Sequence, residues 1–392
     1  MIQLHRLIIS NFKSLNKFIL DFSEFTCLIG LNSSGKSTIL QAIDFVSQQM
    51  NGNISEWLKN RGWEANELKC KLITQKNIEI AVSFTYNDNL YIWMFIYNPI
   101  LKKCINESIE INYISVDNYK TIFEVKNSKY MIIKNLETGE KLEGNIIQDY
   151  EGSFLSSLKS EFLPKVIQEF KIYIQNIYSL DLISPQELRK RSRTGSKLGL
   201  SGENISAFLN TFNKEQKDNL LEQLQKCYPN LDALNVKKSK GGWSRLELIE
   251  KFGEKSITNE AKYLNDGVLR LIAILSQLQS QKSFLLFDEI ENGINSELIE
   301  YLIDTLIASK HQVMITTHSP MVLNYIEDEV AIKSVHYIYK TEEGFTKSIP
   351  FFDIPSMREK LELMGVGEVY IDTNLSNLYE EIKLIQIKED NK

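Results

Sequence analysis

The sequence predicts an α/β fold with a phosphate-binding loop, an antiparallel β subdomain and a helical insertion. The first observation is the string GLNSSGKST, Gly30–Thr38, which lies between an apolar run and a helical pattern. The second is the range 264–319, where short apolar strands alternate with helical segments, as in parallel sheets. The third is the range 78–147, where apolar and polar residues alternate with the two-residue period of strands.

The composition is that of a soluble protein with two or three domains. The chain has 392 residues, of which 43% are hydrophobic and 24% are charged. Its start shows no signal-peptide pattern, and no apolar run approaches the roughly 18–20 residues of a membrane span. We therefore expect a cytoplasmic protein without a membrane partner. The four cysteines lack metal-ligand spacing, and the net charge of −6 argues against a broadly basic surface for nucleic acid.

The N-terminal residues predict two half-buried strands that lead into a buried strand. Apolar residues alternate up to Phe12 and again over Phe18–Phe22, and Cys27–Ile29 is continuously apolar. The range 78–147 predicts an antiparallel β subdomain. Asn87–Asn89 and Glu137–Glu140 have the residue types of hairpin turns within it.

The middle of the chain predicts helices. Apolar residues recur at helical spacing over 154–177, with Pro164 as a helix boundary. A short strand, a turn at Pro185 and a basic loop follow. The range 195–260 is predicted to be an inserted, mainly helical subdomain that contains a hairpin turn at Gly241–Gly242.

The last third of the chain predicts parallel strands, a strand pair and helices. We expect strands at Phe284–Phe287 and Gln312–Thr316 with one helix between them, a strand pair near 334–349, and a final helix from about residue 375. The organisation that follows is an N-terminal lobe with the β subdomain at 1–194, the insertion at 195–260, a C-terminal lobe at 261–350 and a helical tail at 351–392.

The loop Gly30–Thr38 has the residue types that hold a phosphate chain. Gly30 and Gly35 let backbone N–H groups approach phosphate oxygens without a Cβ in the way. The helix that begins near Lys36 offers its free N–H groups and its positive dipole end to an anion. Lys36 is expected to reach the β- and γ-phosphates, and the hydroxyl of Ser37 is expected to bind Mg²⁺. A chance match to the bare string is the alternative.

Two carboxylates and a histidine follow strands that end beside this loop. Asp288 closes the predicted strand 284–287, which is the position at which a carboxylate can hold Mg²⁺. Glu289 is one residue further on and is suited to orient or deprotonate an attacking water. His318 follows the next strand, where it can hydrogen-bond the γ-phosphate and sense its loss. A structural histidine is the alternative.

The segment Leu264–Arg270 (LNDGVLR) precedes a helix and has two possible roles. Asn265 and Gly267 at a helix N-terminus form a second anion site. A second site for a γ-phosphate in a chain with one phosphate loop suggests that two copies pair. The alternative is an ordinary helix cap by Asn265 or Asp266.

These motifs, in this order, resemble the ABC-type ATPase heads of the SMC, RecF and OLD-like class. The resemblance rests on IQLHRLIISNFKSL, GLNSSGKST, SPQELRKR with GLSGENISAFL, LNDGVLR, FLLFDE, ENGIN and TTHSP, and it covers about 1–50 and 180–325. It implies a head-to-head homodimer, or a higher oligomer, that holds two ATP molecules with Mg²⁺. The residues it implies for ATP contact are Lys13, Gly30, Asn32, Ser33, Ser34, Gly35, Lys36, Ser37 and Thr38.

The same resemblance assigns roles to the other motifs. Asn265, Asp266 and Gly267 would act as a signature in trans, on the ATP bound by the partner chain. Glu289 would be the catalytic acid/base with His318 beside it, and Glu291–Asn295 would cross the dimer axis. Mg²⁺ would be held by Ser37 and Asp288, with Gln186 as the candidate for the glutamine loop of the family. A surface turn is the other reading of Gln186.

Several departures narrow the class. Asn265 stands where most ABC proteins have Ser, although an amide can still donate to a phosphate. We expect no long coiled coil because no heptad arm interrupts the chain. The residues after His318 hold no paired acidic motif, so we expect no Toprim nuclease, and the Ser-Gly-Gly signature of transporter ATPases is absent.

Two functional hypotheses follow. In the first, the protein is an ATP-driven dimeric switch in DNA surveillance, repair or anti-phage defence, and it acts with an effector protein encoded by a neighbouring gene. Arg189, Lys190, Arg191 and Arg193 would then supply phosphate contacts to DNA, as would the hairpin Lys237–Arg245. A solvated charged loop is the plain alternative. In the second hypothesis, the dimer is a protein scaffold that holds or releases an effector or toxin without touching nucleic acid.

Overall fold

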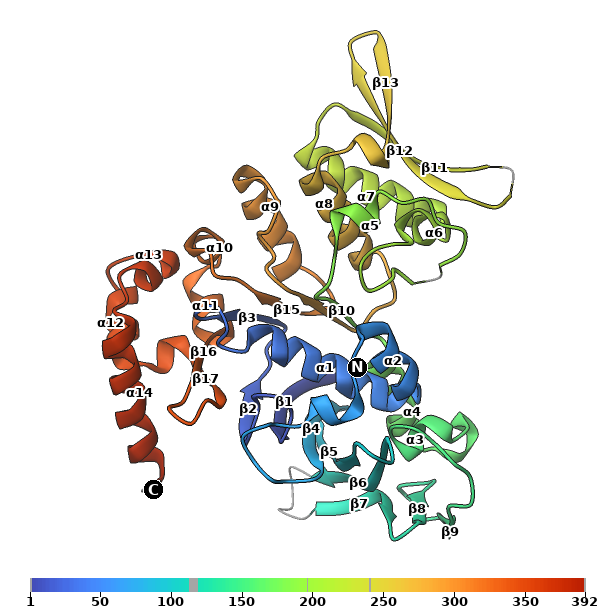
Figure 1. The fold of residues 1–392 in the computed structure, drawn as a ribbon, viewed down its shortest axis with the longest axis vertical. Coiled ribbons are helices and arrows are strands. Elements are labelled where there is room, and N and C mark those ends of the chain that lie inside the picture. The colour runs from blue at the N-terminus through green and yellow to red at the C-terminus, as the bar shows by residue number, and fades with distance from the viewer. Residues whose placement is uncertain (1, 113–118, 196, 240, 391–392) are drawn as a thin grey trace.

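The structure is a computed structural model that describes residues 2–112, 119–195, 197–239 and 241–390. These residues form an eight-stranded sheet, a six-stranded sheet and a three-stranded sheet, with helices between and around them. Figure 1 shows the six-stranded sheet at the middle of the molecule. The eight-stranded sheet lies below it, and the three-stranded sheet projects at the top.

The eight-stranded sheet is antiparallel throughout and confirms the predicted β subdomain. Its order is β2-β1-β4-β5-β6-β7-β8-β9. The turn Asn87–Asp88 joins β4 and β5, and both residues have positive φ, at 48° and 63°, as a two-residue hairpin turn requires. Part of the predicted range, 113–118, lies outside the described residues. The strands are β1 (Gln3–Ser10), β2 (Phe18–Asp21), β4 (Ile78–Tyr86), β5 (Asn89–Asn98), β6 (Lys103–Asn112), β7 (Tyr119–Lys126), β8 (Lys129–Ile133) and β9 (Lys141–Asn145).

The six-stranded sheet carries the phosphate loop. Its order is β10-β14-β15-β3-β16-β17, and all of its strand pairs are parallel except β16 with β17. The two strands predicted at 284–287 and 312–316 are confirmed to the residue. The strands are β3 (Phe25–Ile29), β10 (Ile177–Leu180), β14 (Phe284–Phe287), β15 (Gln312–Thr316), β16 (Val335–Lys340) and β17 (Thr346–Pro350).

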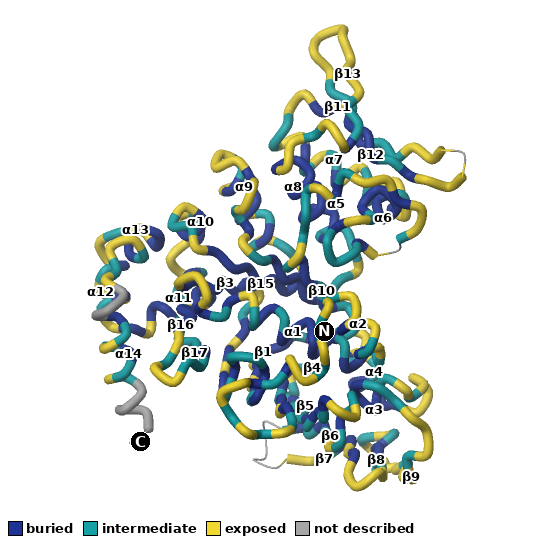
Figure 2. Tube along the Cα trace, viewed as in Figure 1, coloured by how far each residue is buried: buried dark blue, intermediate teal, exposed yellow. Residues whose placement is uncertain are grey.

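Side chains of this central sheet alternate between two hydrophobic cores. Leu285 and Phe287 face one core, which includes α8 (Asp266–Leu278) and α9 (Ser296–Ile307). Phe284 and Leu286 face the other core, which includes α1 (Lys36–Asn51) and the inner face of the eight-stranded sheet. The alternation follows from the two-residue period of a strand. The central strands are therefore buried on both faces, as Figure 2 shows.

The remaining helices flank these layers. Within the range 154–177 that was predicted to be helical, Pro164 is confirmed as a helix boundary, since it is the N-cap of α4. The helices are α2 (Ile54–Arg61), α3 (Phe154–Ser157), α4 (Lys165–Gln175), α5 (Pro185–Leu188), α6 (Ile205–Asn210), α7 (Lys214–Cys227), α10 (Pro320–Asn324), α11 (Asp328–Ser334), α12 (Pro355–Leu361), α13 (Val366–Ile371) and α14 (Leu375–Asp390). Among the described residues, no helix combines the length and the apolar character needed to cross a membrane.

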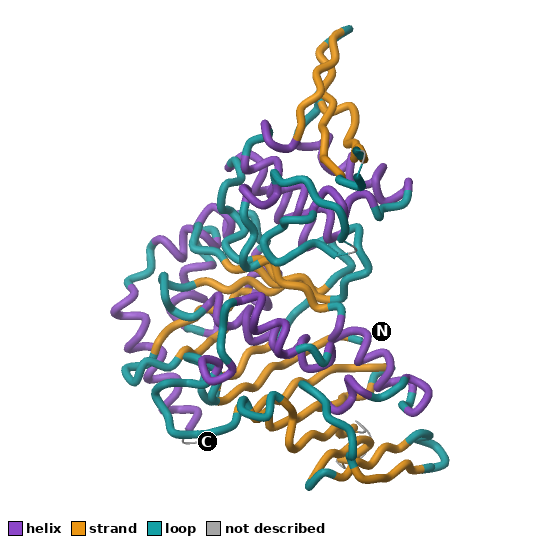
Figure 3. The backbone as a smooth tube through the Cα atoms, turned by 45° about the vertical axis from the view of Figure 1, so that its right-hand side comes forward, coloured by secondary structure: helices purple, strands orange, loops and turns teal. Residues whose placement is uncertain are grey.

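The insertion at 195–260 differs from its prediction as a mainly helical subdomain. Its described residues form α6 and α7 and then three antiparallel strands, β11 (Leu231–Lys238), β12 (Ser244–Phe252) and β13 (Lys255–Glu260). The largely exposed strand β13 carries no apolar alternation, so the sequence pattern gave no sign of this strand. Figure 3 shows the strands projecting beyond the helices. The predicted hairpin turn at Gly241–Gly242 does join β11 and β12.

Candidate nucleotide-binding site

The carboxyl ends of the parallel strands bring the predicted phosphate-site residues to one edge of the central sheet. The phosphate loop follows β3, Asp288 and Glu289 follow β14, and His318 lies two residues beyond β15. A cavity of about 300 Å³ lies at this edge, and we call it the phosphate-loop cavity. The residues that line it are Ser14, Asn32, Ser33, Gly35, Lys36, Ser37, Thr38, Asp288, Glu289 and Lys340.

The phosphate loop has a backbone conformation that residues other than glycine rarely adopt. Gly30, Ser33 and Gly35 have φ of 142°, 65° and 113°, and α1 begins immediately afterwards at Lys36. The amine of Lys36 donates to the carbonyl oxygens of Gly30 at 2.8 Å and Leu31 at 3.1 Å. Burial lowers the pKa of Lys36, whereas the nearby carboxylates, Asp288 first among them, act to raise it. The lysine is thus a buried cation held inside the loop at the start of a helix.

Asp288 and Ser37 lie next to one another in the lining of the cavity. The hydroxyls of Thr316 and Ser37 both hydrogen-bond the Asp288 carboxylate, and burial raises the pKa of that carboxyl against their effect. The pair offers two hard oxygen ligands side by side, which fits Mg²⁺. The described residues contain no cluster of three or more His, Cys, Asp and Glu side chains able to hold a metal ion. A Mg²⁺ ion shared with a phosphate chain needs no such cluster, because phosphate oxygens and waters supply the other ligands.

Glu289 has a strained backbone and an exposed side chain. Its φ is +47°, a region that non-glycine residues seldom occupy, and its N–H donates to Thr316 Oγ1 at 2.8 Å. Asn292 Nδ2 lies 3.4 Å from Glu289 Oε2. The guanidinium of Arg270, a residue given no role from the sequence, lies 3.4 Å from the Glu289 carbonyl oxygen. The carboxylate therefore projects into the cavity from a backbone that its neighbours hold in place.

His318 is placed at the same edge but outside the set of described residues that line the cavity. Its backbone N–H donates to Glu291 Oε1 at 3.1 Å, and its Nδ1 lies 3.3 Å from the same oxygen. The imidazole is half exposed, at 51%. Glu291 was predicted only as part of the loop 291–295, and the structure adds that it fixes the position of His318.

The signature turn, Asn265–Gly267, lies apart from the phosphate-loop cavity of its own chain, since the described lining residues include none of the three. Asn265 caps α8, because its side-chain oxygen accepts from Val268 N at 2.8 Å. Asp266 forms an ion pair with Arg189. A Cβ on Gly267 would lie 2.6 Å from the carbonyl oxygen of Gly293. The helix-cap reading of Asn265 is therefore correct within one chain, and a second role toward another chain stays a prediction.

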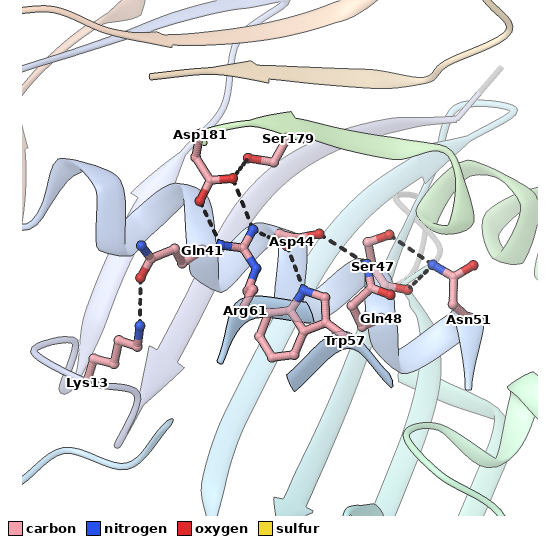
Figure 4. Close-up of polar contacts among 10 residues, drawn as sticks. All are labelled: Lys13, Gln41, Asp44, Ser47, Gln48, Asn51, Trp57, Arg61, Ser179 and Asp181. Atoms are coloured by element: carbon pink, nitrogen blue, oxygen red, sulfur yellow. Dashed lines mark hydrogen bonds and ion pairs between the residues drawn. The ribbon is translucent and has the colours of Figure 1, made fainter. Parts of the chain in front are cut away.

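Lys13, the residue predicted to lie near the nucleotide, precedes the cavity residue Ser14. Its amine donates to Gln41 Oε1 at 2.8 Å, as Figure 4 shows, and lies 3.3 Å from the ring centre of Trp63. Burial, with a smaller effect from Arg61, lowers the pKa of Lys13 to about 8. Lys13 thus contacts Gln41 of α1, and a direct contact with nucleotide stays a prediction.

Arg61 links three elements beside Lys13. Its guanidinium contacts Asp181 at 2.8 and 3.0 Å and Asp44 at 2.6 Å, and Asp44 also accepts from Trp57 Nε1 (Figure 4). The arginine side chain has no exposed surface. These contacts join α2 to α1 and to the end of β10. The network supports the helix that carries Ser37.

The remaining predicted residues lie away from the cavity. Gln186 is exposed on α5, and the described lining residues do not include it. Within the basic loop, Lys190 pairs with Glu187, and Arg191 pairs with Glu260 at 3.3 Å. Arg193 lies 4.6 Å from the ring centre of Trp243. The loop is therefore charged but partly neutralised by acids of its own chain.

The structure also adds two cavity residues that the sequence analysis missed, Ser14 and Lys340. Ser14 lies in the turn after β1, and Lys340 ends β16. Ser14 lies in the N-terminal stretch IQLHRLIISNFKSL but was given no role there, and Lys340 belongs to none of the motifs. The tertiary fold places both residues beside the phosphate loop. The arrangement as a whole defines an α/β nucleotide-binding protein with a phosphate loop.

Comparison with known proteins supports that class and names the family. Residues 2–323 match the AAA ATPase domain, which is most of the chain, so the protein belongs to the AAA ATPase domain family. No match among curated proteins reaches significance. Its family is therefore that of the AAA ATPase domain, and its fold is similar to that of SMC heads.

Two solved structures illustrate the likeness of fold. An SMC head bound to the C-winged helix domain of ScpA aligns with a TM-score of 0.55 and 17% identity, over 88% of this chain and 96% of that one. An Smc head domain with an extended coiled coil, bound to the C-terminal domain of ScpA from Pyrococcus furiosus, aligns with a TM-score of 0.53 and 16% identity. That alignment covers 92% of this chain and 100% of the other. The predicted α/β fold with its likeness to SMC heads is confirmed.

Proposed function

We propose that the protein binds MgATP in the phosphate-loop cavity and hydrolyses it. The observation that carries the proposal is the meeting of Lys36, Ser37, Asp288 and Glu289 in one cavity from two separate strand ends. Lys36 and the start of α1 would bind the phosphates, and Ser37 with Asp288 would hold Mg²⁺, which neutralises charge on the phosphate chain when bound. Glu289 would orient and deprotonate the attacking water.

The second part of the proposal is that ATP closes a head-to-head homodimer. The signature turn lies outside the cavity of its own chain, and its backbone is fixed by the cap of Asn265 and by the close contact of Gly267 with Gly293. A rigid helix N-terminus of this kind can donate to a γ-phosphate held by a second copy. The site would then consist of two halves, each from one chain.

Light scattering and phosphate release, both measured on the purified chain, test the two parts. The Glu289→Gln variant keeps the shape of the side chain but cannot accept a proton, so it should bind MgATP and form a stable dimer. Wild type should dimerise transiently, and both should be monomeric without nucleotide. Rapid hydrolysis by Glu289→Gln would contradict the catalytic assignment. A monomer under saturating MgATP would contradict the dimer.

We propose further that this dimer is a switch that acts with a partner in the cytoplasm. The two similar SMC heads were solved with domains of ScpA bound, which supports docking of a partner protein on a head of this fold. The family resemblance suggests DNA surveillance, repair or anti-phage defence as the setting, with an effector from a neighbouring gene. Co-purification of the chain with the product of the adjacent gene, with and without ATP, tests this part.

The ion pairs of the basic loop favour a second candidate, a protein scaffold that holds or releases an effector without nucleic acid. Arg189, Lys190 and Arg191 each form an ion pair with a carboxylate of the same chain, which partly neutralises their charges. Arg193 gives the clearest test of DNA binding, because its guanidinium stacks on the ring of Trp243, whereas the other three side chains form ion pairs. If DNA is bound, charge reversal at Arg189, Arg191 and Arg193 should abolish binding and Arg193→Glu alone should weaken it. Absence of DNA binding at low salt would favour the scaffold.

A further inference from the structure

The hairpin formed by β16 and β17 forms the wall behind the phosphate loop. The buried hydroxyl of Thr346 donates to the carbonyl oxygen of Ser34 at 2.8 Å and lies 2.8 Å from Ser14 Oγ. A hydroxyl has one proton, so Ser14 must donate in the second of these bonds. The N–H of Thr346 also donates to the Ser14 carbonyl at 2.8 Å. One residue of the hairpin therefore joins the phosphate loop to the turn after β1.

Both glycines that define the phosphate loop are pressed against this hairpin. A Cβ on Gly35 would lie 2.3 Å from Thr346 Oγ1, and a Cβ on Gly30 would lie 2.2 Å from the carbonyl oxygen of Ile338. Both distances are too short for a real side chain. Glycine is therefore required at both positions by the close contact with the hairpin, in addition to any contact with phosphate. The path of the loop is set by the residues behind it.

Lys340 reaches the cavity from the same hairpin. Lys340 and Thr346 are direct cross-strand partners, and partners in an antiparallel pair point to the same face. Thr346 faces the phosphate loop, and Lys340 lines the cavity together with Lys36. Within the described residues, the amine of Lys340 donates to one exposed backbone acceptor, the carbonyl oxygen of Gly344 at 3.1 Å. A phosphate oxygen is a stronger acceptor for an ammonium group than a neutral carbonyl.

We propose that the β16–β17 hairpin is a nucleotide-binding element, in which Lys340 contacts the phosphate chain and Thr346 positions the phosphate loop. The proposal rests on the proposed binding of MgATP at this loop and extends it to a part of the chain without a motif. Lys340 acts on the nucleotide directly. Thr346 acts through the carbonyl of Ser34 and is a positioning residue.

Lys340 gives the decisive test because it is exposed, so that its variants should fold. Lys340→Gln should weaken MgATP binding about tenfold through the loss of a charge-assisted bond, and Lys340→Arg should restore most of it. The loss should be similar for ADP and much smaller for adenosine, which lacks phosphates. Lys333→Gln is the matched control, since Lys333 is an exposed lysine on the preceding helix α11.

Thr346 is tested by a pair of variants that separate its hydroxyl from its bulk. Thr346→Val leaves the Ser34 carbonyl and the Ser14 hydroxyl without their partner, and Thr346→Ser keeps both bonds. The affinity for MgATP should fall about tenfold in Thr346→Val and return to the wild-type value in Thr346→Ser, with both affinities measured well below the melting temperature of each variant. A merely structural threonine would lower the melting temperature and leave the affinity of the folded protein unchanged.

Wild type and Lys36→Ala calibrate the assay. If wild type does not bind MgATP, the proposed function and the hairpin proposal both fail. If wild type binds, Lys36→Ala does not, and Lys340→Gln binds as wild type does, the hairpin proposal alone is overturned. That result overturns the hairpin proposal even if Thr346→Val does not fold.

Discussion

The phosphate-loop cavity and the signature turn differ in how their polar groups are used within one chain. In the cavity, Glu289 is exposed, Lys36 is buried and Asp288 is half-buried. In the signature turn, Asn265 caps its own helix and Gly267 packs against Gly293. In the phosphate-loop cavity the polar groups line a space that a ligand can occupy. In the signature turn they also stabilise the fold of their own chain. Substitutions should therefore act mainly on chemistry in the first region, and on both stability and assembly in the second.

The largest effect should come from Lys36→Ala. The variant removes the cation inside the loop and its charge-assisted bonds to phosphate, so ATP affinity should fall by at least about a hundredfold. Stability should change little, because a buried cation is costly to the fold unless it is fully paired. Calorimetric titration with MgATP measures the affinity, and urea unfolding measures the stability. An unchanged affinity would overturn the assignment of the cavity.

Glu289→Gln should lower the rate of hydrolysis without lowering the affinity for ATP. A general base contributes about 10²–10⁴-fold to a rate, so hydrolysis should fall by that order while ATP affinity is retained. The exposed side chain makes a change in folding stability small, within about 0.5 kcal/mol. Steady-state phosphate release and nucleotide titration give the two numbers. Equal losses of affinity and rate would show that Glu289 binds substrate rather than assists chemistry.

The central parallel sheet was predictable because its signals are local. The strand 284–287 and residues 313–315 of the next strand are continuous apolar runs bounded by polar residues, and such runs predict strands that are buried on both faces. The position of Asp288 could also be predicted, because the carboxyl ends of parallel strands lie at the same edge of a sheet as the phosphate loop. The turn at Asn87–Asp88 is equally local, since Asn and Asp tolerate positive φ.

The contacts behind the loop were not predictable, because they join residues more than 300 positions apart. Thr346 and Lys340 sit in a strand pair whose own sequence shows only alternation, and nothing in it points to the phosphate loop. Glu291 is a similar case, since its bond to His318 depends on how the loop after β14 folds back. The prediction for the insertion was wrong for another reason. Its strand β13 is exposed and lacks an apolar face to detect.

Gly267→Ala tests the second region of the comparison. The added methyl would meet the carbonyl oxygen of Gly293 at 2.6 Å, and backbone on both sides leaves little room to adjust. We expect a loss of about 1–3 kcal/mol in the free energy of unfolding. MgATP-dependent dimerisation should be lost as well, with ATP binding by the monomer retained. Denaturant unfolding, light scattering and nucleotide titration measure the three quantities, and normal dimerisation would contradict the signature assignment.

The smallest effect should come from Asn265, and it separates the cap from the trans contact. Asn265→Ala removes the bond to Val268 N and should cost about 1 kcal/mol of stability, whereas Asn265→Asp keeps the cap. Aspartate, however, cannot donate to a phosphate and adds a negative charge next to it. If Asn265 contacts the γ-phosphate of a second chain, Asn265→Asp should fold as well as wild type and yet fail to dimerise with MgATP. If Asn265 is only a cap, Asn265→Asp should dimerise normally and Asn265→Ala should show no defect beyond its lower stability.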